Sequence, residues 1–126
     1  MDLHAHTELQ GELLVATATG TVAFEPALKI LKGICDLAAE KHAHKILVNT
    51  LAVDGTFSTM ERYQLAVQVT DHLRQLEFSP RLAFVGLPPT SDGFGVRVGQ
   101  NLNVCVELFP TVEQALRWLA AWPAQS

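Results

Sequence analysis

The sequence predicts an α/β domain with a mainly parallel mixed sheet that follows an N-terminal β-hairpin. Two observations lead to this fold class. The first stretch of the chain reads as two strand-like segments around a turn, and the remainder alternates between short apolar runs and longer segments of helical periodicity. Strict alternation of strands and helices favours parallel strands joined by right-handed crossovers. The expected order is therefore β-β-α-β-α-β-α-β-α.

The hairpin and the first helix occupy the N-terminal third of the chain. Strands are expected over residues 3–9 and 12–19, with a turn at Gln10-Gly11. From Glu25 to about Lys41 the apolar residues recur on one helical face, and charged residues lie opposite. The apolar face consists of Ala27, Leu28, Leu31, Ile34, Cys35 and Ala38.

The middle of the chain contains two apolar strands around a helix. Residues 45–52 are expected as a strand, and so are residues 82–86. The run Ser58-Thr59-Met60-Glu61 has the pattern of a capping box, in which the serine caps the helix start and the glutamate side chain reaches back. The helix that begins there is expected to stop before Pro80.

The C-terminal part is expected to contain two helices and one strand. A short helix over residues 91–102 is weakened by its glycines, and a strand follows over residues 104–108. Thr111 can cap a final helix that Pro123 ends. A helical wheel places Trp118 at the edge of the buried face of this helix. That face is expected to comprise Val112, Ala115, Leu116, Leu119 and Trp122.

The composition narrows the class of protein. Apolar residues make up 48% and charged residues 17% of 126 residues, as in a folded chain, and we expect one domain over residues 1–126. The net charge of −4, with scattered Lys and Arg, argues against a nucleic-acid partner. No apolar run approaches the length of a membrane span and the N-terminus does not resemble a signal peptide, so a cytoplasmic location is expected.

The carboxyl ends of the parallel strands are the expected place for a ligand. The loop that precedes the capping box carries the candidate residues Asp54, Gly55, Thr56 and Ser58 for a ligand or an anion. The simpler interpretation is that Ser58 only caps its helix, and a third is that Ser58 accepts a phosphate group.

Neither metal binding nor catalysis is indicated. Two His-x-His pairs, His4/His6 and His42/His44, are expected at opposite ends of the sheet, too far apart for one metal site, and neither pair has a third ligand nearby. The chain lacks a nucleophile elbow, a phosphate-binding glycine loop and converging carboxylates. We therefore expect no metal, no cofactor and no enzymatic activity.

Five short segments, in this order and spacing, resemble the STAS-like proteins related to the anti-sigma-factor antagonist SpoIIAA, in particular a small bacterial branch grouped with Sec14-like lipid-binding domains. The segments are Thr19-Gly20-Thr21-Val22-x-Phe24-Glu25, Lys45-Ile46-Leu47-Val48, Ser58-x-Met60-Glu61-Arg62-Tyr63, Leu82-Ala83-Phe84-Val85-Gly86 and Glu113-x-Ala115-Leu116-x-Trp118-Leu119. The resemblance implies a right-handed β-α superhelix and a non-catalytic role. The Asp-Ser-Ser-Gly phosphorylation turn of the antagonists is absent, because residues 54–58 read Asp-Gly-Thr-Phe-Ser.

Two functions are therefore expected to compete. The first is a regulatory or protein-binding module, which could form a homodimer through Trp118. The second is a carrier or sensor of a small apolar or anionic ligand, as the Sec14-like kinship implies. Its pocket would lie between the sheet and the helices, near Phe24, Phe57, Phe94 and Phe109. A large apolar pocket would favour the carrier or sensor, and a closed core with an exposed apolar patch would favour the module.

Overall fold

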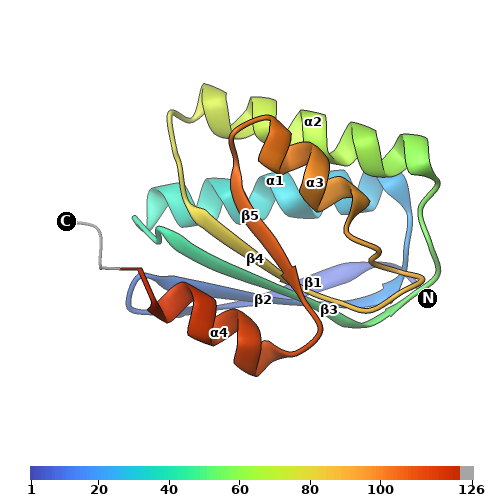
Figure 1. Cartoon of the computed structure of the whole chain (residues 1–126), viewed down its shortest axis with the longest axis horizontal. Coiled ribbons are helices and arrows are strands. Elements are labelled where there is room, and N and C mark those ends of the chain that lie inside the picture. Colours follow the sequence, from blue (N-terminus) through green and yellow to red (C-terminus); the bar gives the residue numbers. More distant parts are fainter. Residues whose placement is uncertain (123–126) are drawn as a thin grey trace.

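The computed structural model describes residues 1–122, which form a five-stranded mixed sheet and four helices in the predicted order (Figure 1). The elements are β1 (His4–Gln10), β2 (Leu13–Thr21), α1 (Phe24–Glu40), β3 (Lys45–Asp54), α2 (Thr59–Gln75), β4 (Arg81–Val85), α3 (Phe94–Asn101), β5 (Cys105–Phe109) and α4 (Val112–Ala120). Pro123, which we expected to end the last helix, lies outside the described residues.

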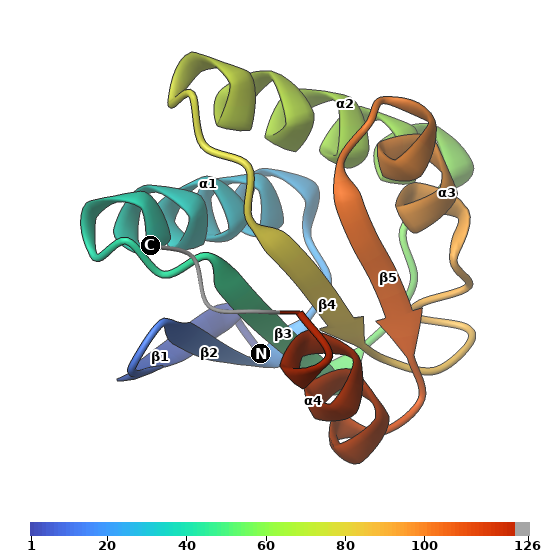
Figure 2. The same cartoon turned by 60° about the vertical axis from the view of Figure 1, so that its left-hand side comes forward.

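The strands lie side by side in the order in which they occur along the chain, β1-β2-β3-β4-β5. The hairpin pair β1–β2 is antiparallel and the other three pairs are parallel, which confirms the predicted topology. Because the three crossovers all step in the same direction, crossovers of one hand place their helices on one face of the sheet. Figures 1 and 2 show α1, α2 and α3 on one face and α4 on the other.

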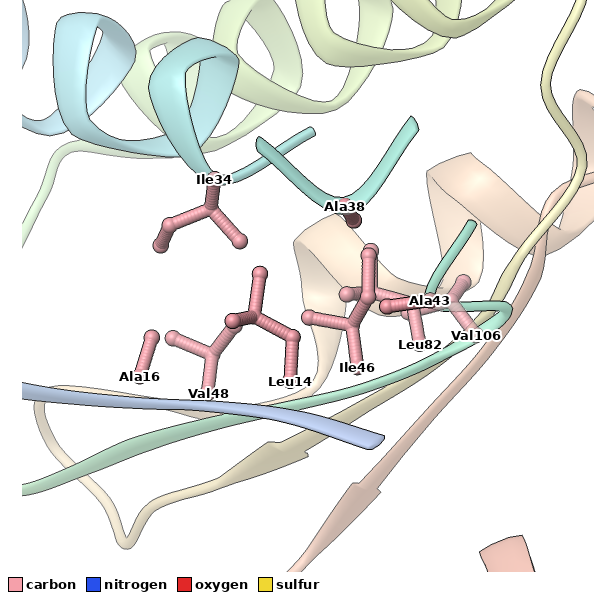
Figure 3. Packing of buried hydrophobic residues seen from close by; sticks show 9 residues of the cluster. All are labelled: Leu14, Ala16, Ile34, Ala38, Ala43, Ile46, Val48, Leu82 and Val106. Atoms are coloured by element: carbon pink, nitrogen blue, oxygen red, sulfur yellow. The ribbon is translucent and has the colours of Figure 1, made fainter. Parts of the chain in front are cut away.

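Each face of the sheet has its own apolar core, because successive strand residues point to opposite sides. On the face covered by α1, Ile34 and Ala38 of this helix point towards the strand residues Leu14, Ala16, Ile46 and Val48 (Figure 3). On the opposite face, Ala115 and Leu119 of α4 pack against Leu47, Ala83 and Val85. The sheet is thus covered by three helices on one side and by one helix on the other.

The buried face of α4 differs from the predicted one. Leu116, expected at its centre, is 38% exposed, whereas Ala115 and Leu119 are almost fully buried. Because the side chain of Ala115 is small, α4 approaches the sheet closely on the side of the helix where Ala115 lies. Leu116 lies on another side and points away from the sheet. Trp122, expected on the same face, is 37% exposed, and the Arg81 guanidinium carbon lies 3.1 Å from the centre of its ring.

Three helices end in a way that the sequence did not reveal. The residue after each C-cap has a positive φ although none is glycine: His42 after α1, Glu77 after α2 and Asn103 after α3. A 6→1 hydrogen bond closes each end, as in a Schellman motif. The bonds are Ala43 N–H to Ala38 O, Phe78 N–H to Leu73 O and Val104 N–H to Gly99 O. Among the described residues, no helix is both long enough and apolar enough to cross a membrane.

Candidate functional site

The loop between β3 and α2 lies at the carboxyl end of the sheet, as predicted. Its candidate residues Asp54, Gly55, Thr56 and Ser58 are all exposed. The Asp54 carbonyl accepts a hydrogen bond from Val22 N–H at 2.9 Å, and the Gly55 carbonyl accepts one from the Thr90 hydroxyl at 2.7 Å. The loop is thereby joined to the connection before α1 and to the loop between β4 and α3.

Ser58 caps α2, which confirms the predicted capping box. Its hydroxyl oxygen accepts a hydrogen bond from Glu61 N–H at 3.1 Å, and Ser58 N–H donates to the Glu61 carboxylate at 2.9 Å. The carboxylate therefore already lies at the positive end of the helix, where it competes with any anion for the same N–H groups. Anion binding at this loop stays a prediction.

A large apolar pocket lies between the sheet and the three helices α1, α2 and α3. It measures about 200 Å³. Its floor comes from strand residues, among them Ala18, Val48 and Leu82, and its roof from helix residues such as Ile30 and Val69. The engineered protein cavity that accepts benzene is of comparable size, roughly 150 Å³. The pocket is therefore large enough for a small organic molecule.

Phe57 lines this pocket, but the other three phenylalanines expected there do not. Phe24 packs against the interface of α1 and α2, and Phe109 belongs to the core beneath α4 on the opposite face. Phe94 is the half-buried first residue of α3. The sequence thus indicated the correct layer for a pocket, but aromatic residues alone did not identify its walls.

Small residues create the space, and this signal was missed. Gly93, Gly95 and Gly99 bring α3 to the rim, while alanines of β2, α1 and α2 line the walls. At Gly99 a Cβ atom would lie 3.2 Å from Val106 Cγ1, so glycine lets α3 approach β5 closely.

Arg62 of α2 holds the two loops together at the edge of the pocket. Its Nε–H donates to the Phe57 carbonyl at 3.2 Å, and its Nη2–H donates to the Pro89 carbonyl at 2.8 Å. Nη1 forms an ion pair with the Asp92 carboxylate. The arginine side chain is only 12% exposed, so these bonds form largely out of water. Asp92 belongs to no sequence motif, and Arg62 was named only within the segment of family resemblance at residues 58–63, without a role of its own.

Asp92 links this arginine to the start of α3. Its carboxylate accepts a hydrogen bond from Phe94 N–H at 2.9 Å. That backbone hydrogen bond, followed by the hydrogen bond and charge of Arg62, lowers the pKa of the Asp92 carboxyl below its ordinary value. Asp92 is therefore ionised at neutral pH and balances the charge of Arg62.

Hydroxyl groups supply most of the remaining polarity of the pocket. Thr50 donates to the Val85 carbonyl and Thr70 to the Ala66 carbonyl, each at 2.7 Å. Ser91 lies close to Thr50, because a Cβ atom on Gly86 would come within 2.6 Å of both hydroxyl oxygens. Gly86 is thus required where these two side chains meet the end of β4.

Trp118 does not line the pocket. It is half-buried on the α4 face, where its ring centre lies 5.6 Å from that of Phe109. The ring thus covers part of the core of its own domain, and the homodimer expected through Trp118 stays a prediction.

The two His-x-His pairs lie at opposite ends of the sheet, as predicted. His4 is paired with Thr19 near the end of β2, whereas Lys45, next to His44, is paired with Leu13 at its start. Within residues 1–122 no three His, Cys, Asp or Glu side chains gather closely enough to hold a metal ion.

Comparisons with known proteins identify the fold. No protein-family model and no curated protein sequence matches the chain. Among solved structures, an anti-sigma factor antagonist from Mycobacterium paratuberculosis is similar, with a TM-score of 0.64 and 13% identity over 94% of this chain and 95% of that one. An uncharacterized DUF3478-family protein with a SpoIIAA-like fold, from Shewanella loihica PV-4, has a TM-score of 0.50 and 18% identity over 93% of each chain. The chain therefore has the STAS-like fold of the SpoIIAA-like proteins.

Proposed function

We propose that this domain is a STAS-like regulatory module that senses or carries a small apolar ligand in the pocket beneath α1, α2 and α3. The observation that carries the proposal is the pocket itself, about 200 Å³ of largely apolar space in the layer where the sequence placed it. Binding pockets are typically apolar cavities with a few placed polar groups. Among residues 1–122 we find no group of side chains at the pocket that is arranged for catalysis, so the proposed role is binding.

The loops at the edge of the pocket explain how occupancy would be communicated. Arg62 binds both the β3–α2 loop and the β4–α3 loop. A ligand that separates the sheet from α2 or α3 would displace these loops together. The exposed residues at the start of α2 would then change position, which would give a partner protein a surface that depends on the ligand.

Displacement of a fluorescent probe tests the proposal. The neutral probe 1-aminoanthracene should bind with a Kd on the order of 10–100 μM and should be displaced by small apolar alcohols. Ala66→Phe fills the pocket from α2 and should abolish binding. Ala120→Phe makes the same change at an exposed position of α4 and should leave binding unchanged. Equal probe binding by both variants would contradict the proposal, provided that circular dichroism shows both to be folded.

A second candidate function is direct regulation of a partner protein without any ligand. Two observations favour it. The similar structure from Mycobacterium paratuberculosis is an anti-sigma factor antagonist, and two large apolar side chains are exposed near the Ser58 cap, Met60 at 65% and Tyr63 at 46%. The partner would then be an anti-sigma factor, and the homodimer through Trp118 and the cytoplasmic location belong to the same proposal.

Binding to purified anti-sigma factors from the source organism tests this candidate. Met60→Glu should weaken the complex, whereas Leu9→Glu, which changes an exposed leucine on β1, should not. A complex that is equally weakened by both changes, or that does not form, would argue against docking at the start of α2.

A further inference from the structure

We propose that the pocket selects uncharged ligands that carry at most one hydroxyl or N–H group, and that it rejects carboxylates and phosphates. This inference rests on the proposed function, because it requires that the pocket bind a small molecule. It decides between the apolar and the anionic ligand, which the sequence left open.

The two charged side chains that line the pocket neutralise each other, and the exposed Arg97 lies outside this lining although its charge also acts on Asp92. Among the described residues that line it, Arg62 and Asp92 are the ionisable ones, and they form an ion pair with each other. The three nitrogens of the Arg62 guanidinium each have a partner, Phe57 O, Pro89 O or Asp92, and its charge is paired with that of Asp92. An incoming carboxylate would therefore lose its hydration shell without gaining an uncompensated cationic partner.

The hydroxyl groups favour a ligand that donates one hydrogen bond. The hydroxyl hydrogens of Thr50, Thr70 and Thr90 are committed to the backbone carbonyls of Val85, Ala66 and Gly55. Their oxygens keep lone pairs that can accept. Ser91, whose hydroxyl lies close to that of Thr50, also lines the pocket and can donate one hydrogen bond to a ligand. An alcohol or a phenol, which both donates and accepts, can pair with the threonine oxygens and with Ser91, whereas an anion, which only accepts, cannot pair with the threonine oxygens.

Asp92 is the residue on which this selectivity depends. Asparagine also bonds to the backbone N–H two residues on, so Asp92→Asn keeps a side-chain oxygen for Phe94 N–H and removes the negative charge. Arg62 would then lie beside the pocket with an uncompensated positive charge. The variant should convert a pocket for neutral ligands into one that tolerates an anion.

Displacement of 1-aminoanthracene by 1-octanol and by octanoate, at neutral pH, tests the inference with two ligands of equal chain length. In the wild type, octanol should bind about tenfold more tightly than octanoate, or better, because only the carboxylate loses charge hydration. In Asp92→Asn, the affinity for octanoate should rise by about tenfold, while the affinity for octanol stays the same. A tenfold change corresponds to the usual net free energy of a hydrogen bond to a charged group.

The outcomes separate the inference from the proposed function. Octanoate that binds the wild type as tightly as octanol, or that gains nothing from Asp92→Asn, overturns the selectivity but leaves a ligand-binding pocket. If neither compound displaces the probe, both the inference and the proposed function are wrong. A thermal melt of Asp92→Asn confirms that the variant is folded.

Discussion

Replacing Arg62 by glutamine tests whether the two loops at the pocket are held by this one side chain. The substitution keeps the first methylene groups of the side chain and removes the guanidinium. Three interactions are lost: the hydrogen bonds to the carbonyls of Phe57 and Pro89, and the ion pair with Asp92.

The expected loss of stability follows from the exposure of each partner. The two bonds to backbone carbonyls form on a side chain that is only 12% exposed, and they should contribute about 1 kcal/mol each. The carboxylate of Asp92 is half exposed, so its ion pair should add about 1 kcal/mol at most. Arg62→Gln should therefore lower the free energy of unfolding by about 2–3 kcal/mol.

Urea denaturation followed by circular dichroism measures this difference. Arg97→Gln is the matched control, because Arg97 is an exposed arginine of α3 that also lies near Asp92. The control should stay within about 0.5 kcal/mol of the wild type. Equal midpoints for Arg62→Gln and Arg97→Gln would refute the role assigned to Arg62.

Other predictions concern the helix ends, the α4 face and the buried thiol. Ser58→Ala should cost about 1 kcal/mol in a urea titration, whereas Ser58→Asp should cost little because aspartate also caps; unchanged midpoints in both variants would contradict the cap. Glu77→Gly should stabilise the protein by about 0.5–1 kcal/mol in the same assay, because glycine relieves a positive φ of 53° at the end of α2; a lower midpoint would contradict this. Trp118→Ala should lower the stability by about 2 kcal/mol through the lost packing on Phe109, and a loss of self-association without a change in stability would instead support the interface. Burial, assisted by the charge of the neighbouring Asp36, raises the pKa of the Cys35 thiol to about 12, so a thiol reagent at neutral pH should label Cys35 only after unfolding. Rapid labelling of Cys35 in the native protein, measured in a Cys105→Ser background because Cys105 is half-buried, would contradict its burial.

Much of the fold could be predicted because local patterns and topology agreed. Apolar runs such as Ile46-Leu47-Val48 read as buried parallel strands, and the capping box at Ser58 marked the start of α2 to the residue. The helix ends were harder to predict. His42 and Glu77 take the left-handed conformation that usually marks a glycine, and local 6→1 backbone hydrogen bonds close the turns without one.

The site could be predicted only in part, because its residues are assembled by tertiary structure. The loop Asp54 to Ser58 was correctly placed at the carboxyl end of the sheet. The ion pair of Arg62 and Asp92 joins residues 30 positions apart. Asp92 lies in no recognisable motif, and the segment of family resemblance that contains Arg62 did not assign it a role. The pocket owes its volume to small residues, and an alanine or glycine in a sequence does not reveal whether a neighbour fills the space beside it.

Methyl NMR spectroscopy during a titration with 1-octanol shows whether the pocket binds a small apolar ligand. We expect saturable shifts of the methyl groups that line the pocket, such as those of Val48, Leu65 and Val96, and no shifts in the core beneath α4, where Leu119 lies. Shifts confined to exposed leucines such as Leu9 and Leu87, or no saturable shifts at all, would show that the pocket is not a binding site.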